Sequence, residues 1–321
     1  MRRLYVAKKT KAVSDVSRVS EEQQNKSQEN FNFNNNDDIF KALEACGLEQ
    51  VTQLIKEHLE SLVTEYKLEK YVILFLFDEY DPIDSFHANK LYEVARQAGE
   101  EKDILLIVHS SGGKIEPAYL ISKTCKSLSH DNFVVAVPRK AKSAATLVSL
   151  GADEIHMGLM SELGPIDPQI NGYPALGLSN ALLKFAEISR DYPESSEMFA
   201  SYLAKTLNLK DVGYFERVSE SAAQYAERLL AGKSLPKDQN AQSLANHFVS
   251  HYKDHGFVID IDECTALLGE SIIKRESNEY KFANEVFRVY NTLAIWLHIV
   301  KKSYLWHVGG IDNQINVKER K

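Results

Sequence analysis

Hydrophobic positions in the first half of the chain fall into short runs that end at turn residues. Three of these runs are rich in β-branched and aromatic residues, which is typical of strands covered on both faces. A fourth, shorter segment with the same character follows. We therefore predict strands at Tyr71–Phe77, Ile104–Val108, Phe133–Val137 and Glu154–Met157.

Between these runs the apolar residues recur at helical spacing. The pattern predicts helices at Ser85–Ala98, Ile115–Leu128 and Ala144–Leu150. Pro117 stands near the start of the second helix, where proline is favoured. Strands that alternate with helices indicate right-handed βαβ units, so we predict an α/β fold with a mostly parallel sheet.

The pattern is helical on both sides of this region. One or two leading helices are expected between residues 39 and 66, broken near Gly47. Beyond Gln169 we predict a series of helices, followed by an irregular tail from Gly309. One of these helices is expected to be capped by Asp262 and to end at Gly269. These helices are expected at Ala181–Ile188, Met198–Leu207, Gly213–Leu230, Gln242–Lys253, Asp262–Leu268 and Glu279–Trp306.

The same patterns divide the chain into four parts. Residues 1–38 are polar and low in complexity, so we expect a disordered tail. Residues 39–69 form an N-terminal helical segment, residues 70–270 a compact core, and residues 271–321 a C-terminal helical extension.

Composition narrows the class of protein. At 321 residues and 44% hydrophobic, the chain can bury one substantial core, and its net charge of −7 argues against a nucleic-acid partner. The apolar runs are too short to cross a bilayer, so we expect no integral membrane segment. Three widely spaced cysteines without a CxxC pair favour a reduced, cytoplasmic protein with no metal and no cofactor.

The sequence HSSGG directly follows the second predicted strand. Gly112 and Gly113 leave main-chain amides uncovered, and such amides can form an oxyanion hole for a tetrahedral intermediate. A strand-to-helix turn that simply requires glycine explains the motif equally well. It is no phosphate-binding loop, because neither GxGxxG nor GxxxxGK[ST] is present.

Ser143 stands between the third strand and a helix of small residues. A hydroxyl at a helix start is close to the positive end of the helix, which favours developing negative charge, and its small neighbours leave room for a substrate. The alternative is that Ser143 is an ordinary N-cap.

A serine nucleophile needs a general base. The histidines offer no obvious one, and we interpret His255 as a surface or packing residue. A lysine can serve if burial lowers its pKa, and Lys184 and Lys205 are the candidates, although each could simply extend into water. Asp167 either orients a catalytic partner or caps a turn.

The stretch from HSSGG through VPRKAKSAATLVSLGADEIHMGLMSELGPIDPQ resembles the serine dehydrogenase proteinase family, relatives of signal peptide peptidase and of the Clp protease subunit. The resemblance implies a ClpP/crotonase-like spiral of ββα units that assembles into a homo-oligomer. It also assigns the oxyanion amides to Gly112 and Gly113 and the nucleophile to Ser143. Clp-type enzymes carry a histidine in the segment that here reads SELGPIDPQ, so the resemblance favours a lysine base, with Lys184 in the matching position and Lys205 as the alternative.

The resulting prediction is a serine endopeptidase with a Ser143–Lys184 dyad, acting on peptide or protein substrates. Two alternatives remain open at this stage. One is a catalytically inactive assembly or adaptor protein on the same fold, and the other is a crotonase-like acyl-CoA enzyme, whose thioester enolate could also be held by two amides.

Overall fold

The computed structural model describes residues 31–99, 101–170 and 173–319. Its centre is a mixed sheet in the order β11-β10-β1-β2-β3-β5-β9. The strands from β1 to β9 run parallel, while β10 is antiparallel to β1 and β11 is antiparallel to β10. The strand bounds are Tyr71–Asp78 (β1), Asp103–Ser110 (β2), Phe133–Ala136 (β3), Glu154–Met157 (β5), Ile273–Arg275 (β9), Ser303–Gly310 (β10) and Asn316–Glu319 (β11). The α/β fold with a mostly parallel sheet is therefore confirmed, together with its four predicted strands.

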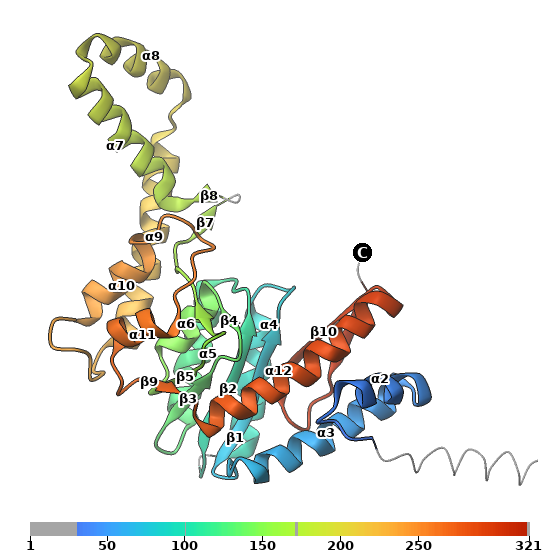
Figure 1. The fold of residues 1–321 in the computed structure, drawn as a ribbon. Helices are drawn as coiled ribbons and strands as arrows, with labels where there is room; N and C mark the ends of the chain where they lie inside the picture. Colours follow the sequence, from blue (N-terminus) through green and yellow to red (C-terminus); the bar gives the residue numbers. More distant parts are fainter. Residues whose placement is uncertain (1–30, 100, 171–172, 320–321) are drawn as a thin grey trace, which may run out of the picture.

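Helices cover both faces of the sheet, and alternate residues of β2 show the division. Ile104, Leu106 and Val108 join the core under one set of helices, while Leu105 and Ile107 join the core under the other. The first set is α4 (Ser85–Ala98), α5 (Ile115–Leu128), α6 (Ala144–Leu150), α9 (Leu209–Leu230), α10 (Ala241–Ser250) and α11 (Ile261–Leu268). The second set is α2 (Asn36–Ala45), α3 (Leu48–Glu65) and α12 (Asn278–Trp296), and α12 crosses this face in Figure 1.

Two short strands continue the fold beyond the end of β2. Strand β4 (Lys140–Ala141) pairs with β2 through Ala141 and Ser110, and β6 (Glu162–Leu163) pairs with β4. The succession β3, β4, α6 is a ββα unit. It turns the chain so that α6 begins beside the carboxyl end of β2.

A helical arm extends away from the sheet (Figure 1). The β7–β8 hairpin lies at its base, and the arm contains α7, the short helix η1 and α8 before α9 returns to the core. The bounds are Gln169–Ile170 (β7), Tyr173–Pro174 (β8), Ala175–Asp191 (α7), Pro193–Ser195 (η1) and Ser196–Thr206 (α8). Large apolar side chains are exposed along it, including Leu183, Met198 and Tyr202.

The C-terminal prediction of one long helix to Trp306 is wrong. Helix α12 ends at Trp296, a π-helical turn follows over Leu297–Lys301 (η2), and Lys302 adopts a left-handed conformation. The chain then forms β10, which pairs with the free edge of β1, and β11 replaces the expected irregular tail. A short apolar run is compatible with either a helix or a strand. Here it forms a strand because it can pair with the otherwise open edge of β1.

Two smaller predictions also need correction. Part of the expected disordered tail is ordered, because Phe33 is buried and α2 begins at Asn36, with Asn35 as its cap. Residues 1–30 lie outside the described residues. Helix α11 is capped by Asp260 rather than Asp262, since the Asp260 carboxylate accepts from the amides of residues 262 and 263.

Candidate active site

Ser143 occupies a strained turn between β4 and α6. Its backbone angles are φ 51° and ψ −119°, a region that side-chain-bearing residues rarely adopt and that costs on the order of 1–3 kcal/mol. The turn is held by three hydrogen bonds: Lys142 N to Ser110 O (3.1 Å), Ala145 N to Lys142 O (2.8 Å) and Thr146 Oγ1 to Ala141 O (2.6 Å). The surrounding structure thus imposes the unusual conformation on Ser143.

The Ser143 hydroxyl does not cap α6. Its side chain makes no capping hydrogen bond, although the residue stands at the N-cap position and is only partly buried. The ordinary N-cap interpretation of the sequence is therefore wrong. A strained serine with an unused hydroxyl at a strand-to-helix turn is the arrangement that presents a nucleophile.

Gly112 lies against Ser143. Because Ser110 and Ala141 are register partners in parallel strands, the residues two positions later meet at the same edge of the sheet. A methyl group on Gly112 would lie 2.6 Å from Lys142 O and 2.8 Å from Ser143 Cβ. Only glycine fits this approach, and its φ of 102° is also one that glycine adopts readily.

The amides of the two glycines differ in what they bind. Gly112 N–H donates to Ser110 Oγ at 3.2 Å. Gly112 O and Lys114 N–H pair with Ile83, which directs the intervening Gly113 amide to the other side of the turn. Within the described residues no acceptor binds Gly113 N–H or Ala144 N–H, the first amide of α6. These amides are the available donors next to Ser143.

Asp167 pairs with a histidine that is distant in sequence. Its Oδ1 lies 2.6 Å from His255 Nδ1, and its Oδ2 accepts from Gln169 Nε2 at 2.6 Å. The Asp167 side chain is 10% exposed and that of His255 is 35% exposed. The hydrogen bond to Asp167 raises the pKa of His255 above its usual value.

Lys142 connects this pair to the nucleophile. The residue precedes Ser143, and its Nζ donates to Phe257 O at 2.9 Å and lies 2.9 Å from Glu162 Oε2. Residues 256 and 257 directly follow His255, so the amine of Lys142 holds the histidine-bearing segment against the start of the Ser143 turn. Its positive charge acts against the effect of Asp167 and lowers the pKa of His255.

Comparison with known proteins identifies the family. The sequence profile of the ClpP-like SDH-type serine proteinases matches residues 48–208, half of the chain. The chain belongs to this family. The matched region contains Ser143, Gly112 and Gly113, and it ends before His255.

Individual relatives match shorter regions. An uncharacterised protein of Methanocaldococcus jannaschii, MJ0137, is 31% identical over 143 residues, 44% of this chain and 50% of its own length. A second one from the same organism, MJ1495, is 26% identical over 180 residues, 56% of each chain. The chain thus spans about half the length of the curated relatives it matches.

Two solved structures are also similar. Both are of the 1510-N membrane-bound stomatin-specific protease, one a serine-to-alanine mutant and the other a lysine-to-alanine mutant in complex with a substrate peptide. Each is 15% identical with a TM-score of 0.40 and covers 69% of this chain, and the matches cover 84% and 79% of those chains. In the part of this chain that the structure describes, no helix is both long and apolar enough to cross a membrane.

The two lysines that the sequence predicts as general bases lie on the arm. Lys184 is on α7, its side chain is 69% exposed, and its Nζ lies 3.0 Å from Glu187 Oε2. Lys205 is exposed in the last turn of α8. Neither side chain has the burial that a lysine base requires.

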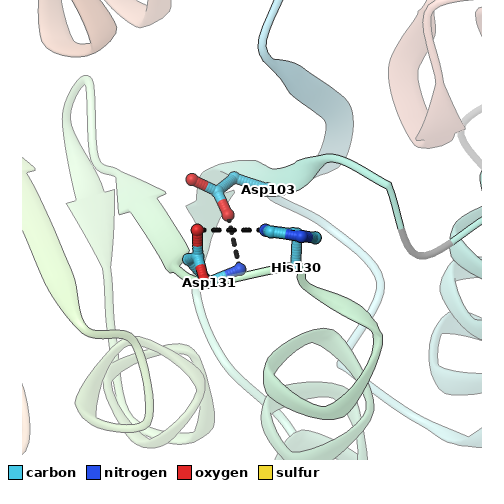
Figure 2. A group of neighbouring side chains, drawn as sticks. All are labelled: Asp103, His130 and Asp131. Carbon is cyan, nitrogen blue, oxygen red and sulfur yellow. Dashed lines mark hydrogen bonds and ion pairs between the residues drawn. The ribbon is translucent and has the colours of Figure 1, made fainter.

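A group of possible metal ligands lies at the opposite end of β2. Asp103, His130 and Asp131 each offer a ligand atom within 4.8 Å of the others (Figure 2). However, Asp103 Oδ1 accepts from the amides of residues 131 and 132, and His130 Nδ1 lies 3.0 Å from Asp131 Oδ2. These bonds already explain the cluster as a stabilised loop at the start of β3.

The His255–Asp167 pair is what the sequence reasoning missed. His255 lies 88 residues after Asp167, and its short neighbourhood KDHGF carries no helical or strand period that would place it. The signal that could have found it is the carboxylate in GPIDPQ, which stands among apolar residues and prolines with no basic residue close by in sequence.

Proposed function

We propose that this chain is a serine peptidase whose nucleophile is Ser143. The observation that carries the proposal is the strained conformation of Ser143, with an uncapped hydroxyl against Gly112. Membership of a serine proteinase family supports the same reaction. A thioester-binding site of the crotonase kind needs the oxyanion amides but has no use for a strained serine beside them.

We propose His255 as the general base, since the segment that follows it is bonded to Lys142, the neighbour of Ser143. Asp167 holds its Nδ1, so Nε2 can accept a proton. In this mechanism Ser143 Oγ attacks the peptide carbonyl as His255 Nε2 takes the hydroxyl proton. His255 then donates that proton to the leaving amine, and water activated in the same way releases the acyl group from Ser143.

The oxyanion would be stabilised by main-chain amides at the Ser143 turn. Gly113 N–H and Ala144 N–H support this role because neither is bound by an acceptor within the described residues. Gly112 provides the close approach that keeps the turn next to Ser143. Loss of one such donor typically lowers the rate by about 10²–10³-fold.

Lys184 and Lys205 remain the competing bases. Either would have to reach Ser143 from the arm and lose its solvent exposure. Lys184 would also have to leave its ion pair with Glu187. A homo-oligomeric assembly and a cytoplasmic location also stay predictions from the sequence.

The proposal is tested by labelling with a fluorophosphonate probe and by hydrolysis of an unfolded protein substrate. We expect stoichiometric labelling of the full chain on Ser143, and loss of both labelling and hydrolysis in Ser143→Ala. Ser149→Ala, which removes a serine hydroxyl that bonds Ala145 O farther along α6, serves as the matched control. Undiminished hydrolysis by Ser143→Ala would refute the assignment, and absence of labelling in the native chain would favour the inactive adaptor.

A further inference from the structure

Two histidines stand one helical turn apart where α10 ends. His247 is in the last turn of α10, and His251 caps the helix with φ −72° and ψ −44°, so the helical backbone continues through both residues. Residues four positions apart lie on the same face of a helix. The two rings are stacked, with centroids 4.1 Å apart and an angle of 16° between their planes. Two imidazoles therefore lie side by side at the surface, where His251 is exposed and His247 is partly buried.

A chain of hydrogen bonds fixes the position of the proton on His247. Tyr252 Oη donates to Glu263 Oε1 at 2.7 Å, so the phenol oxygen accepts from His247 Nε2 at 3.2 Å. Nε2 therefore carries the hydrogen, and the lone pair of the neutral ring is on Nδ1. Metal-binding histidines are typically oriented by such a bond from the second ring nitrogen, which here leads to a carboxylate through Tyr252.

His247 Nδ1 is open to solvent. It has no hydrogen-bond partner within the described residues, and it is not one of the buried polar atoms that lack a partner. The side chain of His251 contacts the rings of His247 and Tyr252, and in the part of the chain that the structure describes no hydrogen bond engages its ring nitrogens. Both histidines thus have a nitrogen available for a ligand from solution, unlike the Asp103 group, where hydrogen bonds already engage the ligand atoms.

The spacing of the two rings suits a shared metal ion. Zn²⁺ binds a histidine nitrogen at about 2.0–2.1 Å, so two nitrogens that share a tetrahedral ion lie about 3.4 Å apart. Rings with centroids 4.1 Å apart are close to that spacing, and the exposed side chain of His251 can turn to reach it. At pH 7.5 an ordinary histidine, with a pKa of about 6.5, is neutral and can bind a metal.

We propose that His247 Nδ1 and a ring nitrogen of His251 bind a divalent transition-metal ion of the Zn²⁺ or Cu²⁺ class, with water completing the coordination. Imidazole is a ligand for these ions, whereas Mg²⁺ and Ca²⁺ prefer oxygen ligands. The cysteine pattern that argues against a structural zinc does not bear on a site built from histidines.

The proposed metal site is next to the segment that carries His255. The Tyr252 ring packs against Phe257 with centroids 4.8 Å apart, and Phe257 O accepts from Lys142 Nζ. A metal ion on His247 would hold the ring in the orientation that bonds Tyr252. We therefore expect the ion to stabilise residues 252–257.

The binding test titrates the full chain, freed of metal with EDTA, with Zn²⁺ at pH 7.5 by isothermal titration calorimetry. We expect saturable binding of Zn²⁺, tighter binding of Cu²⁺ and no binding of Mg²⁺ at the same concentrations. His247→Asn and His251→Asn should each weaken Zn²⁺ binding by at least about ten-fold, because each removes a ligand. His130→Asn is the matched control, since it removes an exposed histidine from the Asp103 group.

Tyr252→Phe tests the hydrogen-bond chain behind His247. The variant keeps the aromatic ring but loses the hydroxyl that accepts from Nε2. Loss of the hydrogen-bond partner of a metal ligand typically lowers metal affinity by about 10–100-fold, and we expect a loss in this range for Zn²⁺. Thermal unfolding of every variant checks that it folds, and the exposed His251 makes His251→Asn the variant least exposed to that difficulty.

Absence of saturable Zn²⁺ binding by the native chain would overturn the proposal. So would undiminished binding by a folded His251→Asn, or a loss of binding in His130→Asn in its place. Hydrogen exchange tests the effect on the neighbouring segment: Zn²⁺ should slow amide exchange in residues 252–257 of the native chain but not of His251→Asn, and unchanged exchange at saturating Zn²⁺ would refute that link. None of these measurements requires peptide hydrolysis, so they decide on the metal site whether or not the chain is a peptidase.

Discussion

Two histidine–carboxylate pairs lie on opposite sides of the sheet and behave in opposite ways. His255 is one-third exposed and bonds Asp167 directly at 2.6 Å, which raises its pKa. His109 is buried and 3.8 Å from Glu79, and burial lowers its pKa despite the carboxylate. The comparison teaches that the same two residue types give a histidine with a raised pKa near water in one place and a buried histidine with a lowered pKa in the other, according to burial and distance.

The largest expected effect comes from removing the exposed histidine. His255→Ala should lower kcat/KM for a protein substrate by about 10²–10⁴-fold, because it removes the proposed general base. The rate of fluorophosphonate labelling should fall with it. If Lys184 were the base, Lys184→Ala would show this loss and His255→Ala would not, so measuring the two variants side by side decides between them.

A third histidine, His307, extends the comparison to the effect of burial on the free energy of unfolding. His307 lies in the same row as His109, since both are register partners of Phe77, but its ring nitrogens are bonded to Tyr290 Oη (2.7 Å) and Gly310 O (3.0 Å). Burial lowers its pKa to about 4, whereas the unfolded chain titrates near about 6.5. The unfolded state therefore takes up a proton first as the pH falls, and this group alone should remove about 3 kcal/mol of unfolding free energy between those two pH values.

Urea unfolding across this pH range measures that loss. His307→Leu should flatten the pH dependence while lowering the stability at neutral pH. An unchanged slope in this variant would mean that other groups cause the acid destabilisation.

A smaller effect is expected from Asp167→Asn. The variant loses the anion that raises the pKa of His255, so the neutral base should persist to lower pH. The acid limb of the pH–rate profile should therefore shift to lower pH. The rate at the optimum should also fall about 10–100-fold, because the imidazole is less well oriented. Glu187→Gln, a carboxylate change on the arm, is the matched control, and an acid limb that stays in place would count against His255.

The smallest effect separates the two buried histidines. His307→Leu leaves the Tyr290 hydroxyl without its partner and should cost about 1–3 kcal/mol at neutral pH. His109→Leu removes a ring nitrogen that has no partner and a second one that lies 3.8 Å from the partly exposed Glu79 carboxylate, so its effect should be smaller, about 1 kcal/mol. Chemical unfolding of both variants tests this, and equal losses would show that His109 has a structural role.

Much of the sheet was predictable because its signals are local. Tyr71–Asp78 and Asp103–Ser110 are apolar on both faces, and the helices at Ser85–Ala98 and Ile115–Leu128 end where the sequence predicts. Ser143 and Gly112 could be named as candidates from the sequence, since each lies shortly after a strand. Parallel register then brings them together.

The remaining features depend on contacts between distant segments. The strand at Ser303–Gly310 forms because β1 has an open edge, which no periodicity in its own sequence reveals. His255 reaches Asp167 from 88 residues away, and the segment that follows His255 is bonded to the amine of Lys142. Lys184 is a lysine among apolar neighbours in sequence, yet those neighbours lie on an exposed arm rather than in a core.

At the Ser143 turn, the residue that would be best for stability differs from the residue that the proposed chemistry needs. Glycine at this position would relax the backbone and make the fold more robust, but it would carry no hydroxyl. Laboratory selection for thermal stability alone should therefore replace this serine early. When activity is selected as well, persistence of the serine would show how strongly its chemistry is required.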